Sequence, residues 1–150
     1  MVKALIGGGC FWGIEEYFRQ LNGVVNTKVG YSGGNFDNPS YEDVCTGKTG
    51  HAEVVLIEYD EKKLSYNEII NHFWKCHDPT QFNRQGLDVG TQYRSAIYYY
   101  SPKQKNVAKN SKIKLQMSLN KLIATEIFKA KDFYVAEDYH QCFIKKKKIV

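Results

Sequence analysis

A chain of 150 residues fits one domain, covering residues 1–150, with enough length to bury a substantial core. Its 43% hydrophobic and 25% charged residues are typical of folded globular proteins and exclude intrinsic disorder. The formal net charge is +5, and the run Lys145 to Lys148 supplies four of these charges. The rest of the chain is nearly neutral, so we expect neither a nucleic acid nor a membrane as a partner.

The apolar segments and the cysteines indicate the compartment. The run Ala4 to Ile6 is too short for a signal peptide or a membrane span, so we expect a cytosolic protein, and a monomer by default. Cysteines in such a chain indicate catalysis or inert burial rather than disulfides. The spacing of zinc ligands is absent, so no metal site is expected. The four cysteines are Cys10, Cys45, Cys76 and Cys142.

The first predicted elements are a strand over residues 3–7, a helix after a glycine turn, and a strand over residues 24–31. Apolar residues recur at helical spacing between the two strands. They are Ile14, Phe18 and Leu21. The charged residues of this helix fall on its other side. They are Glu15, Glu16 and Arg19.

A long irregular stretch, residues 32–50, follows and is expected to be a functional loop. Residues 51–59 then form a predicted strand with an apolar centre. Ser65 and Glu68 make a capping box that opens the second predicted helix, and Pro79 lies just beyond its end.

The last third of the chain continues the irregular alternation. A second loop is predicted over residues 80–92, then a strand over residues 95–100 and a helix capped by Ser101 with proline at its first position. Residues 123–128 form another predicted strand, and a final helix is expected to start near Ala136. This alternation favours an α+β fold, a two-layer sandwich.

The most informative local pattern is Gly7-Gly8-Gly9-Cys10-Phe11-Trp12-Gly13. A cysteine directly before a helix faces unpaired backbone N–H groups and the positive end of the helix dipole, which favours a pKa below the free value of about 8.5. Phe11 and Trp12 would form an apolar wall for a small alkyl group. From spacing alone, an inert buried cysteine is an equally good interpretation.

These residues resemble the signature of the A-type peptide methionine sulfoxide reductases, and further motifs follow in the order of that family. The motifs are Gly9-Cys10-Phe11-Trp12-Gly13, Gly30-Tyr31-Ser32-Gly33-Gly34, Asn38-Pro39-Ser40-Tyr41, Gly47-x-Thr49-Gly50-His51-Ala52-Glu53, Phe73-Trp74-x-x-His77-Asp78-Pro79, Gln85-Gly86-x-Asp88-x-Gly90-Thr91-Gln92-Tyr93-Arg94-Ser95 and Ala136-Glu137-Asp138-Tyr139-His140-Gln141. The resemblance spans nearly the whole chain. It implies a ferredoxin-like sandwich with a central mixed sheet, surrounding helices and long active-site loops.

The resemblance also implies an activity, the thiol-dependent reduction of methionine S-sulfoxide, free or in oxidised proteins and peptides. Cys10 would be the nucleophile and would become a sulfenic acid as methionine leaves. Glu53 would donate a proton, which requires burial to raise its pKa. Tyr41 and Tyr93 would hydrogen-bond the sulfoxide oxygen.

Other positions take supporting roles in the resemblance. Phe11 and Trp12 would receive the S-methyl group, and Asp88 would polarise a water or contact the substrate backbone. Cys142 is the leading candidate to resolve the sulfenic acid, although it departs from the glycine-containing tail of many relatives. Thioredoxin, glutaredoxin with glutathione, or dithiothreitol would supply electrons, with no metal or organic cofactor. Some relatives carry selenocysteine at the position of Cys10.

Two other function classes remain open from the residues. One is another enzyme with an activated Cys10 that reduces peroxides or disulfides. The other is a non-catalytic module that binds peptide or RNA through its tyrosine-rich loops and basic tail.

Overall fold

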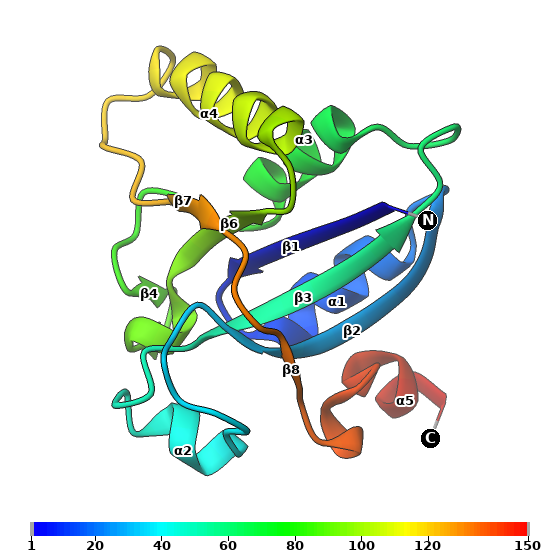
Figure 1. The fold of residues 1–150 in the computed structure, drawn as a ribbon, viewed down its shortest axis with the longest axis vertical. Coiled ribbons are helices and arrows are strands. Elements are labelled where there is room, and N and C mark those ends of the chain that lie inside the picture. Colours follow the sequence, from blue (N-terminus) through cyan, green and yellow to red (C-terminus); the bar gives the residue numbers. More distant parts are fainter. Residues whose placement is uncertain (1, 150) are drawn as a thin grey trace.

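The computed structural model describes residues 2–149 and is organised around a six-stranded mixed sheet (Figure 1). The strand order is β7-β6-β1-β3-β2-β8, with β6 and β7 parallel and the other neighbours antiparallel. The strands of this sheet are β1 (Val2–Gly8), β2 (Val24–Ser32), β3 (Ala52–Tyr59), β6 (Ser95–Tyr99), β7 (Glu126–Lys129) and β8 (Tyr134–Val135). This arrangement confirms the predicted α+β class.

The helices pack mainly against one face of the sheet, with α2 and α5 beside its lower edge in Figure 1. The helices are α1 (Phe11–Arg19), α2 (Tyr41–Cys45), α3 (Tyr66–Cys76), α4 (Pro102–Gln116) and α5 (Phe143–Ile149). Strand alternation places Val55 and Ile57 in the main core under α1, whereas Val54 and Leu56 face a smaller cluster on the other side. Glu53 has the parity of Val55 and so points toward α1.

The predicted helix starts of α3 and α4 are confirmed in detail. The Ser65 hydroxyl accepts from the Glu68 N–H, and the Glu68 carboxylate accepts from the Ser65 N–H, each at 3.1 Å. At α4, the Ser101 hydroxyl accepts from the Gln104 N–H at 3.2 Å, and Pro102 occupies the first position. Both caps satisfy N–H groups that the helices leave free.

Three predicted segments are wrong in detail. The stretch over residues 32–50 contains α2, which a Ser40–Asp43 capping box opens. The loop over residues 80–92 contains a hairpin of β4 (Arg84–Gln85) and β5 (Asp88–Val89). The last helix begins at Phe143, because the chain near Ala136 continues an edge pairing in which the Ala136 N–H donates to the Val29 carbonyl at 2.9 Å.

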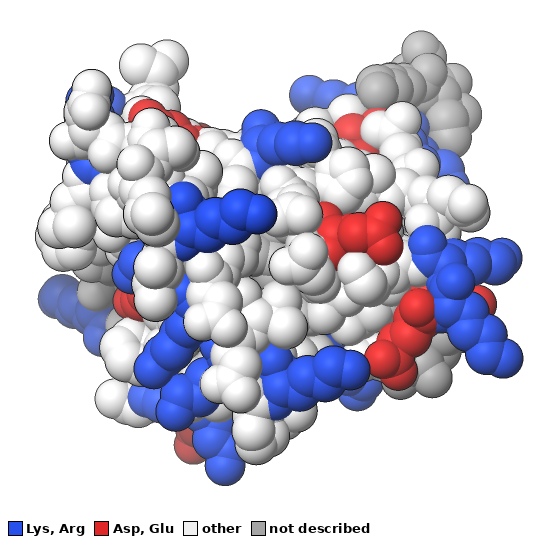
Figure 2. Space-filling model, turned by 90° about the horizontal axis from the view of Figure 1, so that it is seen from above, with Lys and Arg blue, Asp and Glu red and all other residues white. Residues whose placement is uncertain are grey.

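Charge is distributed unevenly over this nearly neutral fold. Helix α4 contains five lysines and no acidic residue. The end of the molecule that carries α3 and α4 consequently shows more basic than acidic side chains (Figure 2). Within residues 2–149, no helix combines the length and the hydrophobicity that crossing a bilayer demands.

Candidate active site

Cys10 lies at the junction where β1 ends and α1 begins. Gly9 precedes it with a φ of +104°, and a Cβ there would lie 2.8 Å from the Gln85 side chain. Glycine is required at this turn by both the backbone conformation and the space. The Cys10 thiol faces the backbone N–H groups of Trp12 and Gly13, as the sequence predicts for a cysteine at a helix start.

The expected low pKa of this thiol is wrong for the free protein. Burial raises the pKa of Cys10 from 9.0 to about 11, against the lowering effect of the Trp12 and Gly13 N–H groups. The negative charges of Glu53 and Asp88 raise it further. The N–H groups at the helix start therefore lower the pKa of Cys10 by less than burial raises it, and the resting thiol keeps its proton.

Glu53 lies beside Cys10 with a perturbed carboxyl group. Its side chain projects from β3, is 2% exposed, and accepts the Phe11 backbone N–H at 3.1 Å. Burial raises the pKa of Glu53 from 4.5 to about 7, while the Phe11 hydrogen bond lowers it and Asp88 raises it. A carboxyl group with this pKa is about half protonated at neutral pH and so can donate a proton as an acid catalyst.

This perturbation predicts a pH-dependent stability. The folded state binds the Glu53 proton more tightly than the unfolded state, so the free energy of unfolding falls as pH rises from about 4.5 to about 7. We expect Glu53→Gln to remove this fall and to be more stable than the parent at pH 8 by up to about 3 kcal/mol. Urea denaturation at pH 4.5 and pH 8 measures the difference. Glu58→Gln on the same strand is the control, and equal pH dependence in both variants would contradict the expectation.

Two tyrosines bring phenol groups to the same place from distant loops. Tyr41 begins α2 and Tyr93 ends a short 3-10 turn, and each phenol affects the pKa of the other. A hydrogen bond with Cys45, followed by burial, raises the pKa of Tyr41, and burial raises the pKa of Tyr93 to about 12. Both phenols therefore remain donors at neutral pH. The charge of Glu53 acts on both.

Asp88 lies on the exposed strand β5 near this group. Its charge raises the pKa values of Cys10, Glu53 and Tyr93. The structure thus gathers one thiol, two carboxyl groups and two phenols from four separate segments, as the motifs predict. Four of these residues lie far from Cys10 in sequence: Tyr41, Glu53, Asp88 and Tyr93.

An aromatic cluster adjoins the thiol. Phe11 is buried and Trp12 half-buried, and the His140 ring lies 5.3 Å and 5.6 Å from their rings. The Tyr41 ring lies 4.7 Å from His140 on another side. Trp12 donates its indole N–H to His140 Nδ1 at 3.0 Å, so the neutral imidazole carries its proton on Nε2. This nitrogen is buried and has no hydrogen-bond partner among residues 2–149.

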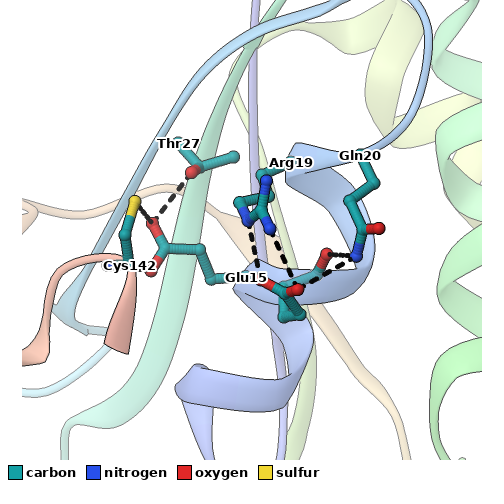
Figure 3. Close-up of polar contacts among 6 residues, drawn as sticks. Glu15, Arg19, Gln20, Thr27 and Cys142 are labelled. Atoms are coloured by element: carbon teal, nitrogen blue, oxygen red, sulfur yellow. Dashed lines mark hydrogen bonds and ion pairs between the residues drawn. The ribbon is translucent and has the colours of Figure 1, made fainter. Parts of the chain in front are cut away.

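Cys142 lies next to α1 rather than in a helix as expected. It precedes α5, and its thiol points at Glu15 on α1, with 3.8 Å between sulfur and oxygen (Figure 3). Glu15 itself is 1% exposed, so its predicted place on the charged side of the helix is corrected: residues near Cys142 cover it. Among the other thiols, Cys76 is largely buried, which raises its pKa to about 12, and Cys45 is exposed.

All four cysteines are free thiols. Among residues 2–149, no group of three or more His, Cys, Asp or Glu side chains is arranged to hold a metal ion.

Glu137 is a site residue that the sequence did not single out. Its Oε2 accepts the Tyr41 backbone N–H and its Oε1 accepts the Tyr31 hydroxyl, each at 3.0 Å. Glu137 therefore fixes the start of α2, which carries the Tyr41 phenol. In the sequence, Glu137 is indicated by its position in the last motif, over residues 136–141.

Comparison with known proteins gives consistent matches. A family model described as peptide methionine sulfoxide reductase matches residues 2–149. The chain is 54% identical to the chloroplastic peptide methionine sulfoxide reductase A4 of Arabidopsis thaliana, over 95% of this chain and 55% of that protein. It is 54% identical to peptide methionine sulfoxide reductase MsrA of Methanosarcina acetivorans, over 97% of this chain and 78% of that protein. The chain thus spans about half the length of the plant relative.

Solved structures extend the likeness to three dimensions. Reduced Mxr1 from Saccharomyces cerevisiae superposes with a TM-score of 0.93 at 37% identity, over 98% of this chain and 86% of that one. Mxr1 in complex with Trx2 matches with a TM-score of 0.68 at 25% identity, over 95% of this chain and 84% of that one.

Proposed function

We propose, from the premise that the chain belongs to the peptide methionine sulfoxide reductase family, that it reduces methionine S-sulfoxide to methionine with Cys10 as the nucleophile. The observation that carries this proposal is the buried Glu53 carboxyl group beside Cys10, whose pKa of about 7 makes it a proton donor at neutral pH.

The reaction begins with proton transfer and attack at sulfur. Glu53 gives its proton to the sulfoxide oxygen, and Tyr41 and Tyr93 donate hydrogen bonds to the same oxygen as its charge develops. The Cys10 sulfur attacks the sulfoxide sulfur. The oxygen then passes from the substrate sulfur to the Cys10 sulfur: the S–O bond of the substrate and the transient S–S bond break, and an S–O bond forms on Cys10. Methionine leaves two electrons more reduced, and Cys10 becomes a sulfenic acid.

The substrate is oriented by the groups around the thiol. Phe11 and Trp12 supply an apolar surface for the S-methyl group, and we assign to Asp88 a contact with the substrate backbone or with a water. An arrangement that places oxygen toward the phenols and methyl toward the indole fits one epimer better than the other, and the likeness to the family supports the S epimer as the substrate.

The sulfenic acid must then be reduced. Cys142 is the candidate that forms a disulfide with Cys10, and an external thiol, thioredoxin or glutaredoxin with glutathione, returns both to thiols. The complex of the related Mxr1 with Trx2 supports thioredoxin as the reductant. Glutaredoxin, the cytosolic location, the single domain and the monomeric state stay predictions.

The test of this proposal is methionine release from the separate S and R epimers of a methionine sulfoxide peptide, with dithiothreitol as reductant. We expect turnover of the S epimer alone. Turnover of hydrogen peroxide or of disulfides in preference to the sulfoxide would favour another thiol enzyme. Failure of the fully reduced protein to turn over either epimer would contradict the proposed function.

A further inference from the structure

A buried carboxylate outside the reacting groups holds the segment that contains Cys142. Glu15 Oε1 accepts the backbone N–H of Cys142 at 2.7 Å, and Oε2 accepts the Thr27 hydroxyl at 2.8 Å. The Cys142 thiol also donates toward Oε2 (Figure 3). All three partners are donors, and the two carboxylate oxygens accept from all of them.

Cys142 is held in a backbone conformation that needs support. Its φ is +50°, in the left-handed region that a residue with a Cβ rarely adopts. Such a conformation persists where surrounding contacts determine it. The Glu15 hydrogen bond to the Cys142 N–H is one of these contacts. Breaking it would therefore favour a change of backbone conformation at the thiol.

Neighbouring residues close the same segment against α1 and β2. The Gln141 side chain bonds both the N–H and the carbonyl of Val29 at 2.9 Å. The Phe143 ring stacks on Trp12, with centroids 3.8 Å apart. This stacking is a further contact that opening of the segment must break.

We propose that Glu15 is a positioning residue that holds Cys142 against the side of α1, so that Cys142 reaches oxidised Cys10 only after the Glu15 contacts break. The inference rests on the proposed function, because it concerns the step that follows methionine release. It assigns two states to the segment: closed while substrate is bound, and open while the sulfenic acid is resolved.

The gated step balances without a further reactant. The Cys142 sulfur attacks the sulfur of the Cys10 sulfenic acid, an S–S bond forms, and the S–O bond breaks. The hydroxyl leaves as water with the proton of the Cys142 thiol. The sulfur of Cys142 is oxidised, and that of Cys10 is reduced from the sulfenic to the disulfide level.

Charged groups on α1 and α5 face the Cys142 thiol. Burial and then the Glu15 carboxylate raise the pKa of Cys142, whereas Lys145, Arg19 and Lys146 lower it. The contribution from β2 is the Thr27 hydroxyl, which does not titrate in this range. Opening removes burial and the nearby carboxylate together, so the thiol becomes more acidic and more reactive once it leaves Glu15.

The test is a single turnover of fully reduced protein with one equivalent of a methionine S-sulfoxide peptide and no reductant. Methionine is quantified in quenched samples, and mass spectrometry follows the dimedone-trapped sulfenic acid and the Cys10–Cys142 disulfide. We expect Glu15→Gln to release methionine at the parent rate and to form the disulfide about tenfold faster at pH 7, since a charged hydrogen bond is lost. The pH profile for the rate of disulfide formation in Glu15→Gln should shift to lower pH than that of the parent.

Glu16→Gln is the matched control, because Glu16 is the neighbour of Glu15 in sequence and bonds Arg19 and Gln20. This variant loses the same charge and should keep the parent rates for both steps. Slower disulfide formation in Glu15→Gln would make Glu15 a proton acceptor and overturn the proposal, as would an unchanged rate and profile. Absence of methionine release from the parent would contradict the proposed function instead.

A second measurement uses the parent protein alone. We expect hydrogen exchange to show the Cys142 amide protected in the reduced protein and unprotected in the Cys10–Cys142 disulfide form. Equal protection in both forms would overturn the proposal.

Discussion

Replacing Cys10 by serine is expected to reduce methionine release by a factor on the order of 10⁴ or more, because the variant lacks the thiol nucleophile and a serine hydroxyl is a far weaker nucleophile at neutral pH. The measurement is release of methionine from the S-epimer peptide with dithiothreitol. Circular dichroism and thermal unfolding of the variant verify that the fold is kept.

Cys142→Ser is the matched comparison for this result. It keeps Cys10, so its first turnover should equal that of the parent, and dithiothreitol should still reduce the sulfenic acid directly. Turnover driven by thioredoxin should fall. Methionine release by Cys10→Ser at a rate near that of the parent would rule out Cys10 as the nucleophile.

The second large effect is expected at Glu53, where the pH dependence identifies the role. The reaction requires that Glu53 and Cys10 together carry one proton, with Glu53 protonated and Cys10 ionised. Because their pKa values are about 7 and about 11, the pair carries one proton between these values. The rate of methionine release in a single turnover should therefore rise tenfold per pH unit up to about pH 7 and stay level above it.

Glu53→Gln should remove the change of slope near pH 7 from the rate–pH profile and lower the rate at pH 7 by about 10²- to 10⁴-fold. Its remaining rate should follow ionisation of Cys10 alone and keep rising through pH 9. Rapid-quench measurements from pH 5 to pH 10 compare the two proteins. If the change of slope near pH 7 persists in Glu53→Gln, a group other than Glu53 causes it.

The sequence predicted those parts of the fold that local patterns determine. Periodicity and capping located α1, α3 and α4, and the family read from the ordered motifs is confirmed by the match over residues 2–149. The five-residue helix α2 was missed, since one turn is too short to show a period. The start of α5 was misplaced because a pairing with distant β2, through Val29, keeps the chain extended near Ala136.

The electrostatics of the site depended on contacts that no local pattern contains. Glu15 has the spacing of a surface residue, and the chain that buries it lies 127 residues away. The helix start at Cys10 predicted a more acidic thiol, whereas folding adds desolvation and the charges of Glu53 and Asp88. The motifs identified which residues come together, but the direction in which the pKa of Cys10 shifts could be determined only from the packed structure.

The protonated state of the resting thiol has a consequence for the protein's own survival under oxidative stress. At pH 7, a thiol with a pKa of about 11 is ionised in roughly one molecule in 10⁴, and peroxides and alkylating agents react with the ionised form. The alkylation rate of Cys10 relative to a free thiol measures this protection. With Cys10 protonated in this way, the nucleophile of the proposed reaction is protected from oxidants while no substrate is bound.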